Sequence, residues 1–196
     1  MNYRSFRELR ADCEACQKCR LGAGRQHLVF GEGSISADVM LIGEGPGQVE
    51  DETGRPFVGP SGELLQELLV KNGLKRQDIY ICNVVKCRPP MNRDPRPEEI
   101  QACIGYLRAQ VALVKPKIIV ALGRFAAMQL LGDDVRVMRD HGKCFRVKNF
   151  TIIPTFHPAA LLHNPANVPM AEADFQIIAQ EVRKLHADAG DTRSAP

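Results

Sequence analysis

The sequence has little that would place it in a membrane or outside the cell. None of its apolar stretches approaches the roughly 20 residues that span a bilayer. The opening residues, MNYRSFRELRADC, alternate in charge and contain no apolar run, unlike a signal peptide. These absences argue against a membrane protein or an exported one, so we expect a protein of the reducing cytoplasm.

Strong charge of either sign is also missing. Lys and Arg number 26 and Asp and Glu number 23, which gives a formal net charge of +3. Any contact with nucleic acid must therefore come from a local basic surface. Internal repeats and low-complexity linkers are absent, and 196 residues fit one domain. We expect a single domain over residues 1–196, with a tail that frays from about residue 189.

Four short β-branched runs alternate with helical patterns. The runs cover residues 38–43, 78–85, 117–123 and 150–155, and the helical patterns cover residues 60–73, 97–115, 124–131 and 171–187. Short apolar runs of this kind are typical of buried parallel strands. The alternation predicts a three-layer α/β/α domain around a central four-stranded parallel sheet.

Chemically unusual residues follow three of these four runs. The turn GEGPG begins at Gly43, Asn83 lies near the end of the second run, and His157 follows the fourth. Ligands of parallel sheets bind beyond the carboxyl ends of the strands, so these residues are expected to converge on one site. Bare glycine backbone allows close approach of a ligand, and the Asn83 amide offers a donor and an acceptor to a base edge.

The glycine-rich turn does not indicate a nucleotide cofactor. It lacks the GxGxxG spacing, and no GK[ST] follows it. The adjoining loop, residues 51–62, instead offers Phe57 as a stacking surface. Ser61 lies at the predicted helix start, where backbone N–H groups bind phosphate.

The seven cysteines are too many to dismiss as small core residues. Cys13, Cys16 and Cys19 form two overlapping CxxC pairs, Cys87 follows the second run, Cys103 lies on the next predicted helix, and Cys82 and Cys144 fall within apolar runs. Four thiolates would complete a zinc site or an iron–sulfur cluster. The spacing alone does not identify the metal, and it does not show which two of the first three cysteines are ligands. We interpret Cys82 and Cys144 as inert buried thiols.

Basic residues concentrate in the segment KCRPPMNRDPRP, beside the expected site. Lys86, Arg88, Arg93 and Arg96 lie there among prolines that keep the chain extended. Such a patch suits a phosphate backbone, although a solvated loop has the same composition.

Three blocks together resemble the family 4 uracil-DNA glycosylases, which carry an iron–sulfur cluster. The blocks are GEGPGQVEDETGRPFVGPSG, NVVKCRPP and HPAALLHNP, and the similarity runs from about Cys16 to the C-terminal helix. The resemblance implies a monofunctional hydrolase that flips uracil out of DNA and cleaves its N-glycosidic bond, leaving an abasic site. The loop NRDPRPEE does not resemble the basic, histidine-containing insert of the related uracil-trapping proteins, so we expect turnover. We also expect a monomer that acts on single- or double-stranded DNA.

The resemblance further implies a structural 4Fe-4S cluster held by Cys16, Cys19, Cys87 and Cys103. Residues 1–25 would then form a cluster-binding segment tied to the rest of the domain. Cys13 is an additional thiol ahead of the pair, and with Cys16 it forms an equally good CxxC chelate.

By the same resemblance, the uracil pocket comprises Gly43, Glu44, Gly45, Phe57, Asn83 and His157. Phe57 would stack on the base, Asn83 would read its edge, and His157 would be the catalytic donor to the carbonyl O2. An asparagine that accepts from N3–H and donates to O4 rejects cytosine, which presents the opposite order. Glu44 is the first candidate for orienting the water.

The expected DNA contacts are Leu161, which matches the wedge residue of the superfamily, and Arg88 and Ser61, which come from the basic loop and the predicted helix start. Leu161 would fill the gap left by the flipped base, and Leu162 competes for that role. A rival interpretation is a nucleic-acid-binding module that keeps the scaffold without catalysis. The presence of both Asn83 and His157 argues against it.

Overall fold

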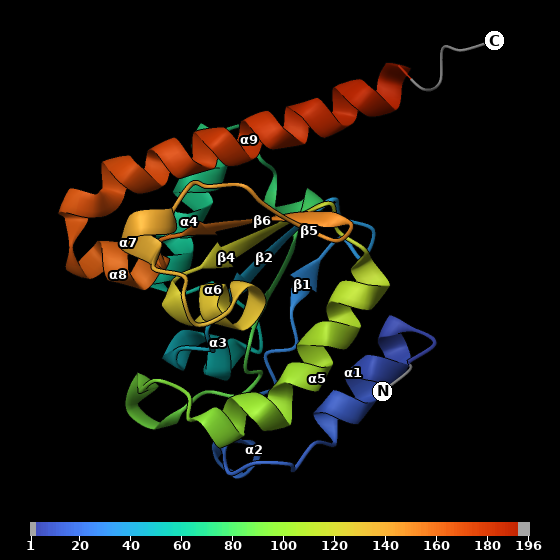
Figure 1. Cartoon of the computed structure of the whole chain (residues 1–196). Coiled ribbons are helices and arrows are strands. Elements are labelled where there is room, and N and C mark those ends of the chain that lie inside the picture. Colours follow the sequence, from blue (N-terminus) through green and yellow to red (C-terminus); the bar gives the residue numbers. More distant parts are fainter. Residues whose placement is uncertain (1–2, 192–196) are drawn as a thin grey trace.

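Six strands form one sheet in the computed structural model, which describes residues 3–191 (Figure 1). Four of them are parallel neighbours in the order β3-β2-β4-β6: β2 (Val39–Gly43), β3 (Tyr80–Asn83), β4 (Ile118–Leu122) and β6 (Phe150–Thr155). The predicted four-stranded parallel sheet is therefore confirmed. Two further strands, β1 (Glu32–Gly33) and β5 (Phe145–Val147), pair antiparallel at the two edges.

The four predicted helices are present. They are α4 (Pro60–Lys71), α5 (Pro97–Val114), α6 (Arg124–Leu131) and α9 (Val168–Asp191). Prolines occupy the first turns of α4 and α5, where a missing N–H costs nothing. The expected tail from about residue 189 falls partly within α9, and its remainder lies outside the described residues. None of the helices between residues 3 and 191 is long and apolar enough to span a membrane.

Shorter helices connect these elements. They are α1 (Phe6–Glu14), α2 (Leu21–Gly24), α3 (Gln48–Thr53), α7 (Val137–Asp140), α8 (Pro158–His163) and three 3-10 turns, η1 (Arg76–Asp78), η2 (Pro90–Asn92) and η3 (Pro165–Asn167). Two of them matter for the site, because α3 follows the glycine-rich turn and α8 begins directly after His157.

Alternate strand residues face two separate hydrophobic cores. On one side Met40 and Ile42 of β2 pack with α5 and α6, and on the other Val39 and Leu41 pack with α4 and α9. This alternation with a period of two residues gives the sheet a helical layer on each face. Figure 1 shows α9 crossing one side of the sheet and α5 lying beside α1 on the other. The three-layer α/β/α class is confirmed.

A third core joins the N-terminal segment to the domain. Leu9 and Cys13 of α1 pack with Phe30 and with Tyr106 and Ala109 of α5. The segment that carries Cys16 and Cys19 is thereby anchored on the helix that carries Cys103.

Candidate active site and cysteine site

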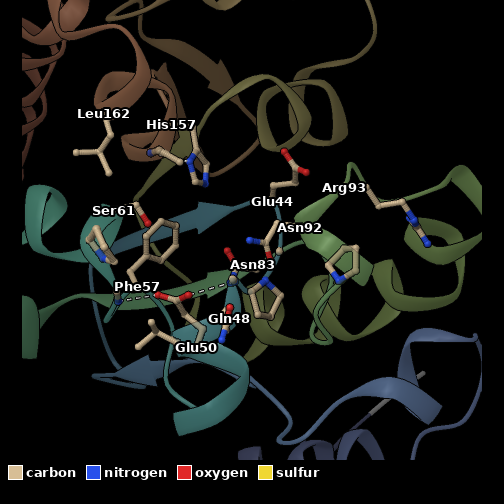
Figure 2. Close-up of a pocket in the computed structure, with 18 of the residues that line it drawn as sticks. Glu44, Gln48, Glu50, Phe57, Ser61, Asn83, Asn92, Arg93, His157 and Leu162 are labelled. Atoms are coloured by element: carbon tan, nitrogen blue, oxygen red, sulfur yellow. Dashed lines mark hydrogen bonds between the residues drawn. The ribbon is translucent and has the colours of Figure 1, made fainter.

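A cavity of about 430 Å³ opens at the carboxyl ends of β2, β3 and β6. Figure 2 shows Phe57, Asn83 and His157 around the same space. Its walls include Glu44, Gly45, Glu50, Phe57, Ser61, Asn83, Asn92, Arg93, His157 and Leu162. The structure therefore brings together most of the residues expected at this sheet edge, and Gly43 lies directly behind them at the end of β2.

His157 presents a hydrogen-bond donor to this cavity. Its Nδ1 accepts the backbone N–H of Ala159 at 3.2 Å, so the proton of the neutral ring lies on Nε2. Burial lowers the pKa of His157 to about 4, and Glu50 only partly opposes that shift. Nε2 is shielded from solvent and has no hydrogen-bond partner among the described residues. At neutral pH the ring is thus an uncharged imidazole with one unused N–H.

Asn83 presents an unused acceptor to the same cavity. The residue is 1% exposed, and its Oδ1 has no partner in the described part of the chain. A Cβ atom at Gly43 would lie 2.4 Å from Oδ1 and 2.5 Å from Cζ of Phe57, so only glycine leaves room for both side chains. A buried polar atom without a partner costs about 1–3 kcal/mol, and two such atoms in one cavity indicate a ligand that satisfies both.

Phe57 forms an aromatic wall next to His157. Their ring centroids lie 5.7 Å apart, and the ring planes are inclined by 36°. The Phe57 backbone is left-handed, with φ of 51°, a strained conformation for a residue with a side chain. Gly62 permits this packing, because a Cβ atom there would lie 2.1 Å from the Phe57 carbonyl.

Glu50 holds the loop that carries Phe57. The residue is 7% exposed, and its Oε1 accepts the N–H groups of Val58 and Gly59, each at 2.9 Å. Its Oε2 accepts the N–H of Gly47, the N-cap of α3, at 3.1 Å. Figure 2 marks the bonds to Glu50 that join residues drawn there. Glu50 was not predicted from the sequence, although a glutamate three residues after an N-cap is placed to accept the N-cap N–H.

Glu44 is a carboxyl group in the cavity wall whose pKa lies close to neutral pH. Burial, together with the nearby charge of Asp94, raises its pKa to about 7, and Arg124 opposes the rise. At pH 7 both protonation states are therefore populated, which suits a group that accepts a proton.

The structure does not support Leu161 as the residue that enters DNA. Leu161 is 1% exposed and belongs to the core shared by α4, α8 and α9. Leu162, the alternative, is 48% exposed and lies on the cavity wall. Adjacent helical residues point in different directions, and here only the second faces outward.

The basic loop divides into exposed and buried positions. Arg88 is half-buried and donates from Nε to Oδ1 of Asn92 at 2.7 Å. Arg93 forms a bidentate ion pair with Glu99 and lines the cavity. Lys86 is 1% exposed, so the interpretation of this lysine as part of a phosphate-binding surface is wrong.

The four cysteines implied as ligands approach one another. Burial raises the pKa of Cys87, and the nearby thiols of Cys19 and Cys16 add to the rise. Burial likewise raises the pKa of Cys103 to about 11, with Cys87 and Cys19 contributing in the same direction. Arg25 donates from Nη1 to the Cys87 sulfur at 3.3 Å. Within residues 3–191, no three His, Cys, Asp or Glu side chains are arranged to hold a single metal ion.

The other three cysteines differ in their surroundings. Cys13 is 1% exposed in the core between α1 and α5, and burial raises its pKa to about 12. Cys82 is fully buried in β3, as expected. Cys144 is exposed, so its interpretation as a buried thiol is wrong.

Comparisons with known proteins place the chain in a family. Residues 30–183 match the model of the Uracil DNA glycosylase superfamily. The chain is 47% identical to a Type-4 uracil-DNA glycosylase of Thermotoga maritima over 78% of this chain and 80% of that relative. Identity is 46% to a Type-4 enzyme of Pyrobaculum aerophilum (77% and 81% covered) and 42% to one of Archaeoglobus fulgidus (85% and 87% covered). The chain therefore belongs to the type-4 uracil-DNA glycosylases of this superfamily.

Proposed function

We propose that this protein removes uracil from DNA by hydrolysing the N-glycosidic bond and leaving an abasic site. The observation that carries the proposal is the pair of unused polar atoms in the cavity, Oδ1 of Asn83 and Nε2 of His157. Uracil presents N3–H beside O2, an adjacent donor and acceptor that match this pair. Cytosine presents an acceptor at N3, which would leave the Asn83 oxygen unpaired and buried.

The cavity residues support a route through a flipped base. A base inside a duplex is unreachable, so uracil must leave the stack and enter the cavity, where Phe57 offers its ring as a stacking surface. Gly43 leaves room for the Asn83 and Phe57 side chains in the cavity, and Gly45 lets the turn pack against Val85, since a Cβ atom at Gly45 would lie 2.7 Å from the Val85 side chain.

Bond cleavage leaves negative charge on uracil, and His157 is the donor placed to stabilise it. The neutral ring already carries its proton on Nε2 and donates to O2 without first gaining a proton, so the site is organised before the bond breaks. Glu44, with its pKa of about 7, orients the water that attacks the sugar and accepts its proton.

DNA contacts are assigned to the cavity rim. Leu162 replaces Leu161 as the side chain that fills the gap in the stack, because it is exposed beside the cavity. Ser61, in the first turn of α4, faces the cavity where backbone N–H groups attract phosphate. Arg88 supplies positive charge on the adjoining loop.

A 4Fe-4S cluster held by Cys16, Cys19, Cys87 and Cys103 completes the proposal. The proximity of these thiols and membership of the type-4 family support it, and the resemblance favours Cys16 and Cys19 as the N-terminal ligands over Cys13, which also lies near Cys16, Cys87 and Cys103. The cluster would link residues 1–25 to the loop after β3 and to α5. We further infer a cytoplasmic monomer of one domain that needs no nucleotide cofactor.

The proposal is tested by incubating the purified protein with matched oligonucleotides that contain uracil or thymine at one position. Alkali then breaks the strand at abasic sites. We expect breaks only at uracil, in single- and double-stranded substrates. Binding of uracil-containing DNA with no strand breaks would instead support a non-catalytic binding module.

A further inference from the structure

Lys86 is a buried ammonium group directly beneath the uracil cavity. The residue follows β3 and is 1% exposed, although it stands in a basic segment of the chain. Its Nζ donates to the main-chain carbonyl of Asn83 at 2.6 Å and to Oε1 of Gln110 at 2.5 Å. Burial of a charge is costly unless its hydrogen bonds are satisfied, so these contacts require an explanation.

Gln110 extends this contact into a network. The residue lies on α5 with no exposed surface, and its Nε2 donates to the carbonyl of Phe30 at 2.8 Å and to the hydroxyl of Tyr80 at 3.0 Å. Lys86 therefore rests on an amide that is itself fixed by two partners. Buried networks whose members are all satisfied make the surrounding structure rigid.

The groups that face Lys86 are carbonyl oxygens and cysteine sulfurs. In the described part of the chain, no carboxylate forms an ion pair with its ammonium. Burial raises the pKa of Cys82 and of Cys103, and Lys86 opposes the rise at both. The lysine thus lies between the cysteine site and the residue whose side chain lines the cavity.

The far end of the network is the segment that positions the Asn83 amide. Val84 and Val85 donate their N–H groups to Gly43 and Glu44 of the glycine-rich turn, at 2.9 and 3.0 Å. The Asn83 carbonyl is held from the opposite direction, by Lys86. We propose that Lys86 is a positioning residue that, supported by Gln110, fixes the backbone of Asn83 and so aims its side chain at the base.

This inference rests on the proposed uracil-releasing activity for one of its readouts. The decisive variant is Lys86→Met, which keeps an unbranched side chain one atom shorter and removes its donors. We expect the single-turnover rate of uracil release to fall about 10- to 100-fold, as for loss of a charged hydrogen bond. Amide hydrogen exchange of Val84 and Val85 should rise at the same time. If Lys86→Met does not fold, Lys86→Gln, which keeps a shorter neutral donor, takes its place in every measurement.

Two controls separate positioning from general destabilisation. Ile178→Ala removes a fully buried side chain of α9 on the other face of the sheet. It should lower the melting temperature without changing the rate or the exchange of Val84 and Val85 well below that temperature. In an Asn83→Ala background, Lys86→Met should lower the rate no further, because residues that act through one another are not additive.

A full additional loss in the Asn83→Ala background, or unchanged exchange at Val84 and Val85 in Lys86→Met, would overturn the inference. If the wild-type protein releases no uracil, the proposed function fails, while the exchange measurement still decides whether Lys86 fixes the Asn83 segment.

Discussion

Two histidines close to the end of β6 have opposite surroundings. His157 uses Nδ1 to accept a backbone N–H and leaves Nε2 unused in the cavity. His141 follows α7, and its Nδ1 lies 2.8 Å from Oδ1 of Asp174, whose other oxygen accepts the hydroxyl of Thr155 at 2.6 Å. The hydrogen bonds of Asp174 with His141 and Thr155 hold α9 to the end of β6. The unused Nε2–H of His157, in contrast, marks a place where a ligand can accept a hydrogen bond.

The largest effect should follow loss of the unused donor. His157→Ala should lower the single-turnover rate of uracil release about 100- to 1000-fold, as for removal of one donor that stabilises developing charge. The melting temperature should fall only by a few degrees, because Nε2 has no protein partner among the described residues to lose and the hydrogen bond that is lost is the one from Ala159 to Nδ1, which caps α8. A rate within threefold of wild type would assign the stabilisation of O2 to another group.

A smaller loss is expected from filling the space beside the unused acceptor. Gly43→Ala puts a methyl group within 2.4 Å of Oδ1 of Asn83 and displaces Phe57. Misplacement of about 1 Å typically costs on the order of 100-fold in rate. Uracil release and free-uracil affinity should fall together, and unchanged affinity would show that the amide is not aimed at the base.

The dependence of the uracil-release rate on pH tests the role of Glu44. Since the pKa of Glu44 is about 7 and its deprotonated form is the one that accepts a proton, the rate should rise about tenfold per pH unit below 7 and level off above it. Glu44→Gln should flatten this profile. A Glu44→Gln variant that keeps the wild-type profile would remove Glu44 from the mechanism.

The opposite pattern is expected at His141. His141→Ala leaves the buried Asp174 without one partner, at a cost of about 1–3 kcal/mol. At roughly 2–4 °C per kcal/mol for a chain of this length, the melting temperature should fall by several degrees. Uracil release well below that temperature should be unchanged. A rate loss comparable to that of His157→Ala would erase the distinction between the two histidines.

The smallest effect should come from the exposed cysteine. Cys144→Ser should keep the iron content and visible absorption of anaerobically purified protein, whereas Cys103→Ser should lower both. Equal iron loss in the two variants would contradict the ligand assignment, and a colourless zinc-containing wild-type protein would contradict the cluster.

The sequence predicted the parallel sheet because its strands are continuous apolar runs, and α5 because its apolar spacing is helical. It did not indicate β1 and β5, which are short and partly exposed edge strands. The strand-end rule brought Asn83 and His157 to one cavity. That rule could not decide whether Leu161 or Leu162 faces outward, and it did not predict that Lys86 is buried. Both features depend on tertiary packing.

The most direct test measures free base released at pH 7 from oligonucleotides that differ only in having uracil or cytosine at one position. Complementarity to Asn83 and His157 predicts release of uracil, with cytosine left in place. Release of both bases at similar rates, or of neither, would contradict the recognition of uracil by Oδ1 of Asn83 and Nε2 of His157.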